Sequence, residues 1–156
     1  MRFYRICRAA QGTARAAFSG LGATKQDGRW THGRPNVRAV YCSESLPLAC
    51  LETLVHIRPM PRRFPPSIFY SIDIPDELLE RPAHSALPAG WNDPVAPAAA
   101  RDFGSAFVTE SRAVALVVPT AILPLGLNAL VNPLHPAFRL AWVRGPQPFV
   151  YDGRLK

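Results

Sequence analysis

The sequence is short of three things that would indicate a class of protein at once: cysteine, lysine and long apolar runs. Its three cysteines, Cys7, Cys42 and Cys50, are an odd number without C-x-x-C spacing, and no histidine cluster has the spacing of zinc ligands. This argues against a disulfide framework and a metal site, so we expect buried thiols in a reducing compartment. No apolar run approaches the roughly 18 residues that span a bilayer, and the first residues contain no signal-peptide core. We therefore expect a cytoplasmic protein without a membrane segment.

Charged residues are also scarce, at 19% against 48% hydrophobic residues. That balance is typical of a chain that folds around a packed core rather than of a disordered chain. The length of 156 residues is that of one domain, since single cores usually fill at about 100 to 200 residues. We therefore expect a single domain over residues 1–156.

The net charge of +7 comes almost wholly from arginine, because only Lys25 and Lys156 are lysines. A basic chain invites a nucleic-acid interpretation. However, the basic residues are scattered, with one tight group at Arg58, Arg62 and Arg63, and no expected helix has a basic stripe interleaved with aromatics. Arginine presents a planar fork of donors suited to phosphate or carboxylate. An anionic small ligand or an acidic partner protein fits this charge at least as well, and we expect no direct contact with nucleic acid.

Seventeen prolines divide the chain into short elements, most of which have the alternating or continuous apolar pattern of strands. One helix has a clear start, with Ser45 as a candidate N-cap and Pro47 in its first turn, and Pro59 marks its end. Together the elements predict an α+β fold. The expected strands are 2–7, 37–42, 67–74, 113–118, 139–143 and 148–151, and the expected helices are 46–58 and 94–109.

Three residues have the types needed to cleave a bond between ribose and a cationic leaving group. Arg29 follows a glycine-rich stretch, Tyr41 lies near the end of a strand, and Glu52 lies at the margin of the apolar face of helix 46–58. An arginine can bind a diphosphate through two hydrogen bonds, an aromatic ring can stack on a positively charged nicotinamide, and a carboxylate can stabilise an oxocarbenium-like transition state. Each also has an ordinary interpretation, as a surface cation, a core aromatic and a glutamate paired with His56 one turn later.

Eight short segments, in order along almost the whole chain, resemble the RES-domain family, which is named for Arg, Glu and Ser positions. Its members are toxins of bacterial Xre/RES toxin–antitoxin pairs. The segments are Tyr4-Arg5-Ile6, Phe18-Ser19-Gly20-Leu21-Gly22-Ala23, Gly28-Arg29-Trp30, Val40-Tyr41-Cys42-Ser43, Leu51-Glu52-Thr53-Leu54-Val55-His56, Val118-Pro119-Thr120-Ala121, Asn128-Ala129-Leu130-Val131-Asn132-Pro133 and Tyr151-Asp152-Gly153-Arg154-Leu155.

The resemblance implies an ADP-ribosyltransferase-like fold, with two small packed β-sheets and a few helices around a cleft for NAD. It also implies an activity without a metal: loss of cellular NAD by cleavage of the bond between nicotinamide and ribose, through hydrolysis or phosphorolysis. Carried over by motif, Arg29 would bind the diphosphate or the nicotinamide ribose, and Tyr41 would stack on the nicotinamide. Glu52 would be the catalytic carboxylate, and Thr120 stands at the family serine and keeps a hydroxyl.

Other polar residues have two interpretations each. Ser43 is a candidate NAD contact or a cap, and His56 a candidate ribose contact or a residue that orders Glu52. Asn128 and Asn132 are interpreted as turn formers, because asparagine readily bonds its local backbone. An ion pair is expected between Asp152 and Arg154 near the C-terminal end.

Two other functions remain open from the sequence. One is the transfer of ADP-ribose to a protein, and the other is a non-catalytic basic module that binds RNA or an acidic protein. The resemblance further implies a partner, an Xre-like helix-turn-helix antitoxin whose C-terminal part closes the cleft, and hence a hetero-oligomer.

Overall fold

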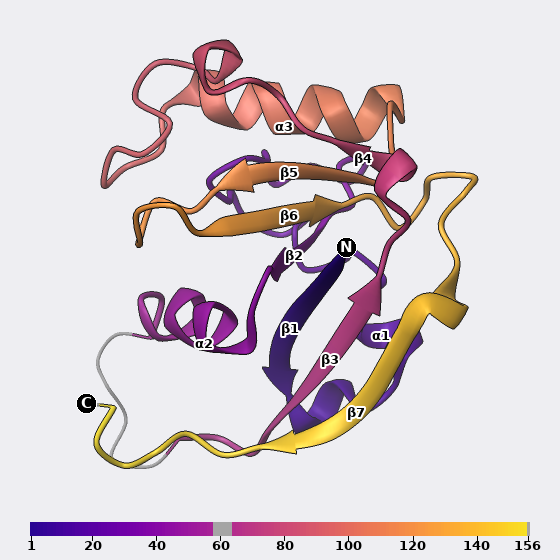
Figure 1. Cartoon of the computed structure of the whole chain (residues 1–156), viewed down its shortest axis with the longest axis vertical. Coiled ribbons are helices and arrows are strands. Elements are labelled where there is room, and N and C mark those ends of the chain that lie inside the picture. Colours follow the sequence, from indigo (N-terminus) through magenta and orange to yellow (C-terminus); the bar gives the residue numbers. More distant parts are fainter. Residues whose placement is uncertain (58–63, 156) are drawn as a thin grey trace.

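The computed structural model of the chain describes residues 1–57 and 64–155. Within these residues, seven strands form one mixed sheet in the order β4-β5-β6-β2-β1-β3-β7, flanked by three α-helices (Figure 1). The expected α+β class is confirmed. The strands are β1 (Arg2–Arg8), β2 (Val40–Ser43), β3 (Ser67–Asp73), β4 (Leu79–Glu80), β5 (Ala115–Pro119), β6 (Leu127–Val131) and β7 (Val143–Phe149), and the helices are α1 (Ala14–Ala17), α2 (Leu46–Leu54) and α3 (Ala98–Glu110).

The sheet has two halves that meet at a narrow seam. β1 and β2, which are neighbours there, share the single register pair Tyr4↔Ser43, whereas β1 pairs with β3 along its whole length. One half is made of β4, β5, β6 and β2 and the other of β1, β3 and β7; in Figure 1, β5 and β6 run at a clear angle to β1, β3 and β7. The two small sheets expected from the sequence correspond to these halves, which hydrogen bonds join into one sheet.

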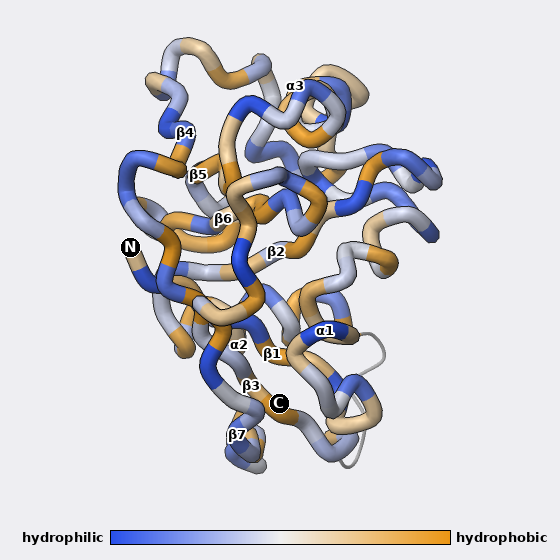
Figure 2. The backbone as a smooth tube through the Cα atoms, turned by 90° about the vertical axis from the view of Figure 1, so that its right-hand side faces the viewer, coloured by the Kyte–Doolittle hydropathy of each residue, from blue (hydrophilic) through white to orange (hydrophobic). Residues whose placement is uncertain are grey.

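Hydrophobic packing continues across this seam. One buried cluster includes Phe3 of β1, Val40 of β2, Tyr70 of β3 and Val117 of β5. A second cluster lies under α3, and Figure 2 shows that this helix carries both hydrophobic and hydrophilic residues. None of the helices within the described ranges is long and apolar enough to cross a membrane.

The local signals predict the start of α2 but neither its end nor the start of α3. Ser45 caps α2 as expected, since its hydroxyl accepts a hydrogen bond from the Leu48 amide, and Pro47 lies in the first turn. The helix ends at Leu54, earlier than the expected residue 58. α3 starts at Ala98 rather than at residue 94. Pro59 and the basic group of Arg58, Arg62 and Arg63 lie outside the described residues.

Two expectations for the strands were wrong. Residues 139–143 do not form a strand, because Leu140–Trp142 is a 3-10 helix, and residues 148–151 do not form a separate strand, because β7 runs continuously from Val143 to Phe149. β6 was missed altogether. Gly126 before it and Pro133 after it are strong turn signals, so the sequence pattern favours a loop here. In the structure this segment is a short strand that pairs with both β2 and β5.

Candidate active site

A broad open groove of about 1980 Å³ lies against β1, β2 and α2 at the seam of the sheet. Five of the six residues selected from the sequence line it, namely Arg29, Tyr41, Ser43, Glu52 and His56. They come from three kinds of structure: a coil, a strand and a helix. The fold therefore brings together residues up to 27 positions apart in one concave surface, as expected for a binding site.

Glu52 is the most tightly held of these residues. It lies on α2, is half-buried, and uses its Oε1 atom to accept two hydrogen bonds. The donors are the hydroxyl of Thr120 at 2.5 Å and the side-chain amide of Asn128 at 2.5 Å. Within residues 1–57 and 64–155, Oε2 of Glu52 has no hydrogen-bond partner. The carboxylate is thus fixed by one oxygen and presents the other.

Thr120 acts on Glu52 rather than on the groove. It directly follows β5, is only 5% exposed, and accepts a hydrogen bond from the Ile122 amide while it donates to Glu52. Its neighbours Pro119 and Ala121 line the groove, but Thr120 is not among the lining residues. The Thr120 hydroxyl therefore orients the carboxylate.

Asn128 is a site residue that the sequence analysis misinterpreted. It lies within β6 and is not a turn former; its amide nitrogen donates to Glu52, and its Oδ1 accepts from the buried hydroxyl of Ser43 at 2.8 Å. Ser43 in turn is on β2, directly opposite Asn128 in the sheet register. The only signal for this in the sequence was membership of one of the eight resembling segments. Asn132 does bond its local backbone, since it accepts from the Leu134 amide.

Tyr41 lines the groove, while its hydroxyl is anchored beneath the coil that carries Arg29. The hydroxyl accepts a hydrogen bond from the Trp30 amide at 3.2 Å and shares another with the Thr31 hydroxyl at 2.9 Å. Burial raises the pKa of Tyr41 above its ordinary value, so the phenol stays neutral. Gly28 must be a glycine here, because a Cβ atom at this position would lie 2.5 Å from the Tyr41 hydroxyl.

Arg29 is held by main-chain oxygens that are far away in the sequence. Its Nη1 atom donates to the carbonyls of Trp91 at 2.7 Å and Asp93 at 2.8 Å. No local pattern in the sequence predicts these contacts, because both carbonyls lie more than 60 residues away in an irregular segment. A second arginine, Arg5 of β1, also lines the groove and donates to the Tyr41 carbonyl at 3.0 Å.

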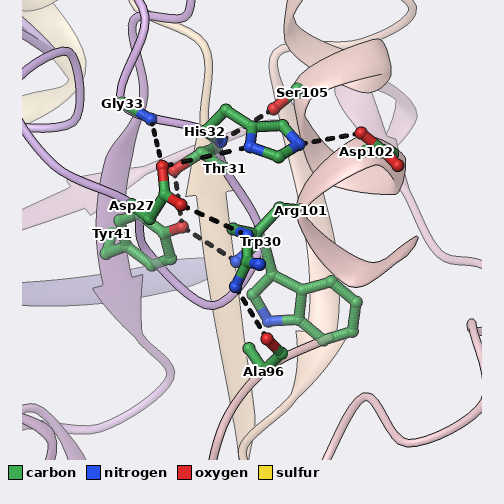
Figure 3. A network of polar contacts seen from close by, with 10 residues as sticks. All are labelled: Asp27, Trp30, Thr31, His32, Gly33, Tyr41, Ala96, Arg101, Asp102 and Ser105. Carbon is green, nitrogen blue, oxygen red and sulfur yellow. Dashed lines mark hydrogen bonds and ion pairs between the residues drawn. The ribbon is translucent and has the colours of Figure 1, made fainter. Parts of the chain in front are cut away.

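A polar network ties the coil after Arg29 to α3 (Figure 3). His32 Nε2 contacts Asp102 Oδ1 at 2.8 Å, its amide donates to Ser105 at 3.0 Å, and Asp27 accepts from the Gly33 amide at 2.8 Å. This backbone hydrogen bond, more than the nearby Arg101, lowers the pKa of Asp27. The network fixes the coil on both sides of Arg29, through Asp27 and His32. The position of Arg29 therefore depends on α3 as well as on its own segment.

Two further expectations concern residues near the groove. His56 lines it from an exposed position just past the end of α2, and the paired His56–Glu52 arrangement is not formed: Glu52 bonds Thr120 and Asn128 instead. The ion pair between Asp152 and Arg154 is present at 2.9 Å. In the part of the chain that the structure describes, no group of three or more His, Cys, Asp or Glu side chains could hold a metal ion.

The fold agrees with the comparisons to known proteins. A family model for the RES domain matches residues 2–152, so the chain belongs to the RES-domain toxin family. It is 34% identical over 160 residues to a "Prs ADP-ribosylating toxin" of Sphingobium sp. (strain YBL2), covering 98% of this chain and 95% of that protein. It is 37% identical over 139 residues to a "Toxin Res" of Photorhabdus laumondii, covering 88% and 85%.

A solved structure has the same fold. The M. tuberculosis MbcT–MbcA toxin–antitoxin complex contains a chain that superposes with a TM-score of 0.69 at 18% identity, covering 99% of this chain and 85% of that one. At this identity the similarity establishes the architecture. The fold of this chain is therefore shared with a chain of that complex.

Proposed function

We propose that this protein is the toxin of a toxin–antitoxin pair and that it consumes NAD by cleaving the bond between nicotinamide and ribose. The observation that carries the proposal is how Glu52 is held. Its Oε1 accepts hydrogen bonds from Thr120 and Asn128, and its Oε2, on a side chain that lines the groove, has no partner among the described residues. A carboxylate held in this way is suited to stabilise positive charge on a sugar, because it need not reorganise as the charge develops. Membership of the RES-domain family supports the assignment.

The other groove residues supply binding and orientation. Arg29 binds the diphosphate through its guanidinium, and the ring of Tyr41 stacks on the cationic nicotinamide. As the bond between the anomeric carbon and the nicotinamide nitrogen breaks, its electron pair moves to that nitrogen and neutralises the leaving group. Glu52 stabilises the ribosyl cation until an acceptor oxygen, from water or phosphate, bonds the anomeric carbon; water gives up a proton in this step. The leaving group is already cationic, so the reaction needs no metal to activate it.

A protein side chain is the second candidate acceptor. It is favoured by the 34% identity to a relative named as an ADP-ribosylating toxin, whose reaction would share the same first bond cleavage. Glu52, Arg29 and Tyr41 would keep their roles, and only the group that attacks the anomeric carbon would differ.

The proposed toxin function implies a partner that blocks the groove. We propose that an Xre-like helix-turn-helix antitoxin closes the groove in the cytoplasm, giving a hetero-oligomer without direct contact between toxin and nucleic acid. A solved structure of the same fold was determined as a toxin–antitoxin complex. The groove contains the cationic side chains of Arg5 and Arg29, which an acidic segment of the antitoxin would complement.

Proton NMR of the purified protein with NAD tests this function, with free nicotinamide followed in the presence and absence of phosphate. Glu52→Gln is the matched control, because the amide oxygen can still accept from Thr120 and Asn128 while the charge is lost. We expect nicotinamide release from the wild type and a loss of at least about 100-fold in the variant. Dependence on phosphate would identify the acceptor. Equal release by both proteins would contradict the role of Glu52, and no release without an added protein would favour a protein acceptor or a non-catalytic module.

A further inference from the structure

The contacts of Arg29 use only one end of its guanidinium. A guanidinium carries five N–H donors, and the two on Nη1 are taken by the carbonyls of Trp91 and Asp93. Among the described residues, Nε and Nη2 of Arg29 have no hydrogen-bond partner. These two atoms form the edge that binds a phosphate or carboxylate through two parallel hydrogen bonds. The carbonyl contacts therefore leave the anion-binding edge available in the groove.

The carbonyls belong to an irregular segment, residues 88–97, that we call the strap. It precedes α3 and contains no helix or strand. Asn92, Pro94 and Ala96 of the strap line the groove. No sheet ladder holds this backbone, so its position depends on side-chain packing and on single hydrogen bonds such as that from Arg101 Nη1 to the Ala96 carbonyl, at 2.7 Å.

Trp91 is the aromatic anchor of the strap. Its indole stacks on Trp30, with ring centroids 5.9 Å apart and planes 21° from parallel, and the ring of His84 meets it edge-on at 5.8 Å. Trp30 is itself fixed: it is 2% exposed, its amide bonds the Tyr41 hydroxyl, and α3 contacts its backbone at Gly104. The stack thus docks the strap on the residue that directly follows Arg29.

We propose that Trp91 is a positioning residue for Arg29, and that its stack on Trp30 sets the strap carbonyls so that the Nε/Nη2 edge faces the diphosphate of NAD. The inference rests on the proposed function for its ligand. Trp91 touches no reacting atom in this arrangement. It controls the direction of a guanidinium through the backbone of its own segment, and the carbonyls of Trp91 and Asp93 become part of the anion site.

Steady-state nicotinamide release by Trp91→Ala, Trp91→Phe and a control tests the proposal. Val95→Ala is the control, since Val95 is on the same strap, is 82% exposed and does not line the groove. We expect a rise in KM for NAD on the order of tenfold in Trp91→Ala with a smaller change in kcat, because the diphosphate is bound in the ground state and in the transition state alike. Trp91→Phe, which keeps an aromatic ring, should recover most of the affinity, and Val95→Ala should match the wild type.

A second measurement follows the rotation of the Arg29 guanidinium and does not depend on enzymatic activity. The measurement is ¹⁵N NMR of the free protein, in which the signals that disappear in Arg29→Lys belong to Arg29. A guanidinium that is held at Nη1 rotates slowly about its Nε–Cζ bond. It therefore gives separate signals for Nη1 and Nη2. We expect these signals to merge in Trp91→Ala and to stay separate in Val95→Ala. Unchanged KM, or separate signals in Trp91→Ala, would overturn the inference. If the wild type released no nicotinamide, the proposed function would fail, while the NMR result would still decide whether Trp91 positions Arg29.

Discussion

The two walls of the groove hold their charged residues in different ways. Glu52 projects from a regular helix and is fixed by side chains on or next to β5 and β6, with both hydrogen bonds at 2.5 Å. Arg29 lies on a coil and is fixed by carbonyls of another coil. The position of the carboxylate is therefore tied to the sheet, whereas the position of the arginine is tied to aromatic packing and loop contacts. Changes in loops should alter binding at the arginine wall and leave the carboxylate wall intact.

The largest effect should come from disturbing the packing of α3 against the coil that carries Arg29. In Gly104→Ala the new methyl group would overlap the carbonyl oxygen of Trp30, so α3 and the coil must separate. We expect a loss of about 3 kcal/mol in the free energy of unfolding, at the upper end for overpacking and larger than the gain of about 1 kcal/mol in helix propensity. Chemical denaturation measures it. A stability equal to that of the wild type would show that the coil yields freely.

A substitution that changes charge, and hardly changes side-chain volume, tests the wall of the groove that carries Glu52. Asn128→Asp replaces the donor to Glu52 with a second carboxylate, which repels the Glu52 carboxylate because the two charges have the same sign. We expect a loss of about 100-fold in kcat/KM at pH 7. Asn128→Ala removes the donor without adding charge and should lose less activity. The rate of nicotinamide release measures both variants, and equal rates for the two would contradict the contact.

Two glycines in one segment differ in how closely they approach Tyr41. A methyl group at Gly28 meets the Tyr41 hydroxyl at 2.5 Å, whereas one at Gly22 meets nothing within 4 Å. Gly28→Ala should displace the tyrosine ring, with a loss of about 1–2 kcal/mol in stability and weaker NAD binding. Gly22→Ala should change neither. Thermal unfolding and titration with NAD in the Glu52→Gln background separate the two variants. Equal behaviour would mean that the Tyr41 hydroxyl is not confined.

The smallest effect should come from a pair outside the groove. Arg2 donates to Asp73 at 2.7 Å, and this hydrogen bond holds the pKa of Asp73 below its ordinary value. A lowered pKa favours folding above the unfolded value of about 3.9, and the contribution disappears as the pH falls through the folded value. Asp73→Asn should therefore lower stability by less than about 1 kcal/mol at pH 7, without changing nicotinamide release, and by nothing at strongly acidic pH. Denaturation at both pH values checks the sign.

The sequence predicts the regular wall much better than the irregular one. The start of α2 has a local cause, an N-cap at Ser45 and a proline in the first turn, and both are visible in the sequence. The contact of Glu52 with Thr120 crosses 68 residues and was not predicted, since the sequence analysis identified the two residues only as separate positions of one family pattern. The contacts of Arg29 with the strap follow no periodicity, since they join two coils through backbone atoms. β6 was not predicted because it also depends on contacts that are distant in the sequence. Its pairing with β2 and β5 overrides the turn propensity of Asn128.

The single register pair between β1 and β2 has a consequence for cooperativity. Backbone hydrogen bonds normally transmit order from strand to strand, but at the seam the two halves share few of them and are joined mainly by the cluster that contains Phe3 and Val117. Apolar contact is non-directional, so it couples the halves without fixing their register. In hydrogen-exchange terms, the halves should behave as two protection units with their own opening free energies. The groove lies at the boundary between them, where partial unfolding begins with the least loss of backbone hydrogen bonding.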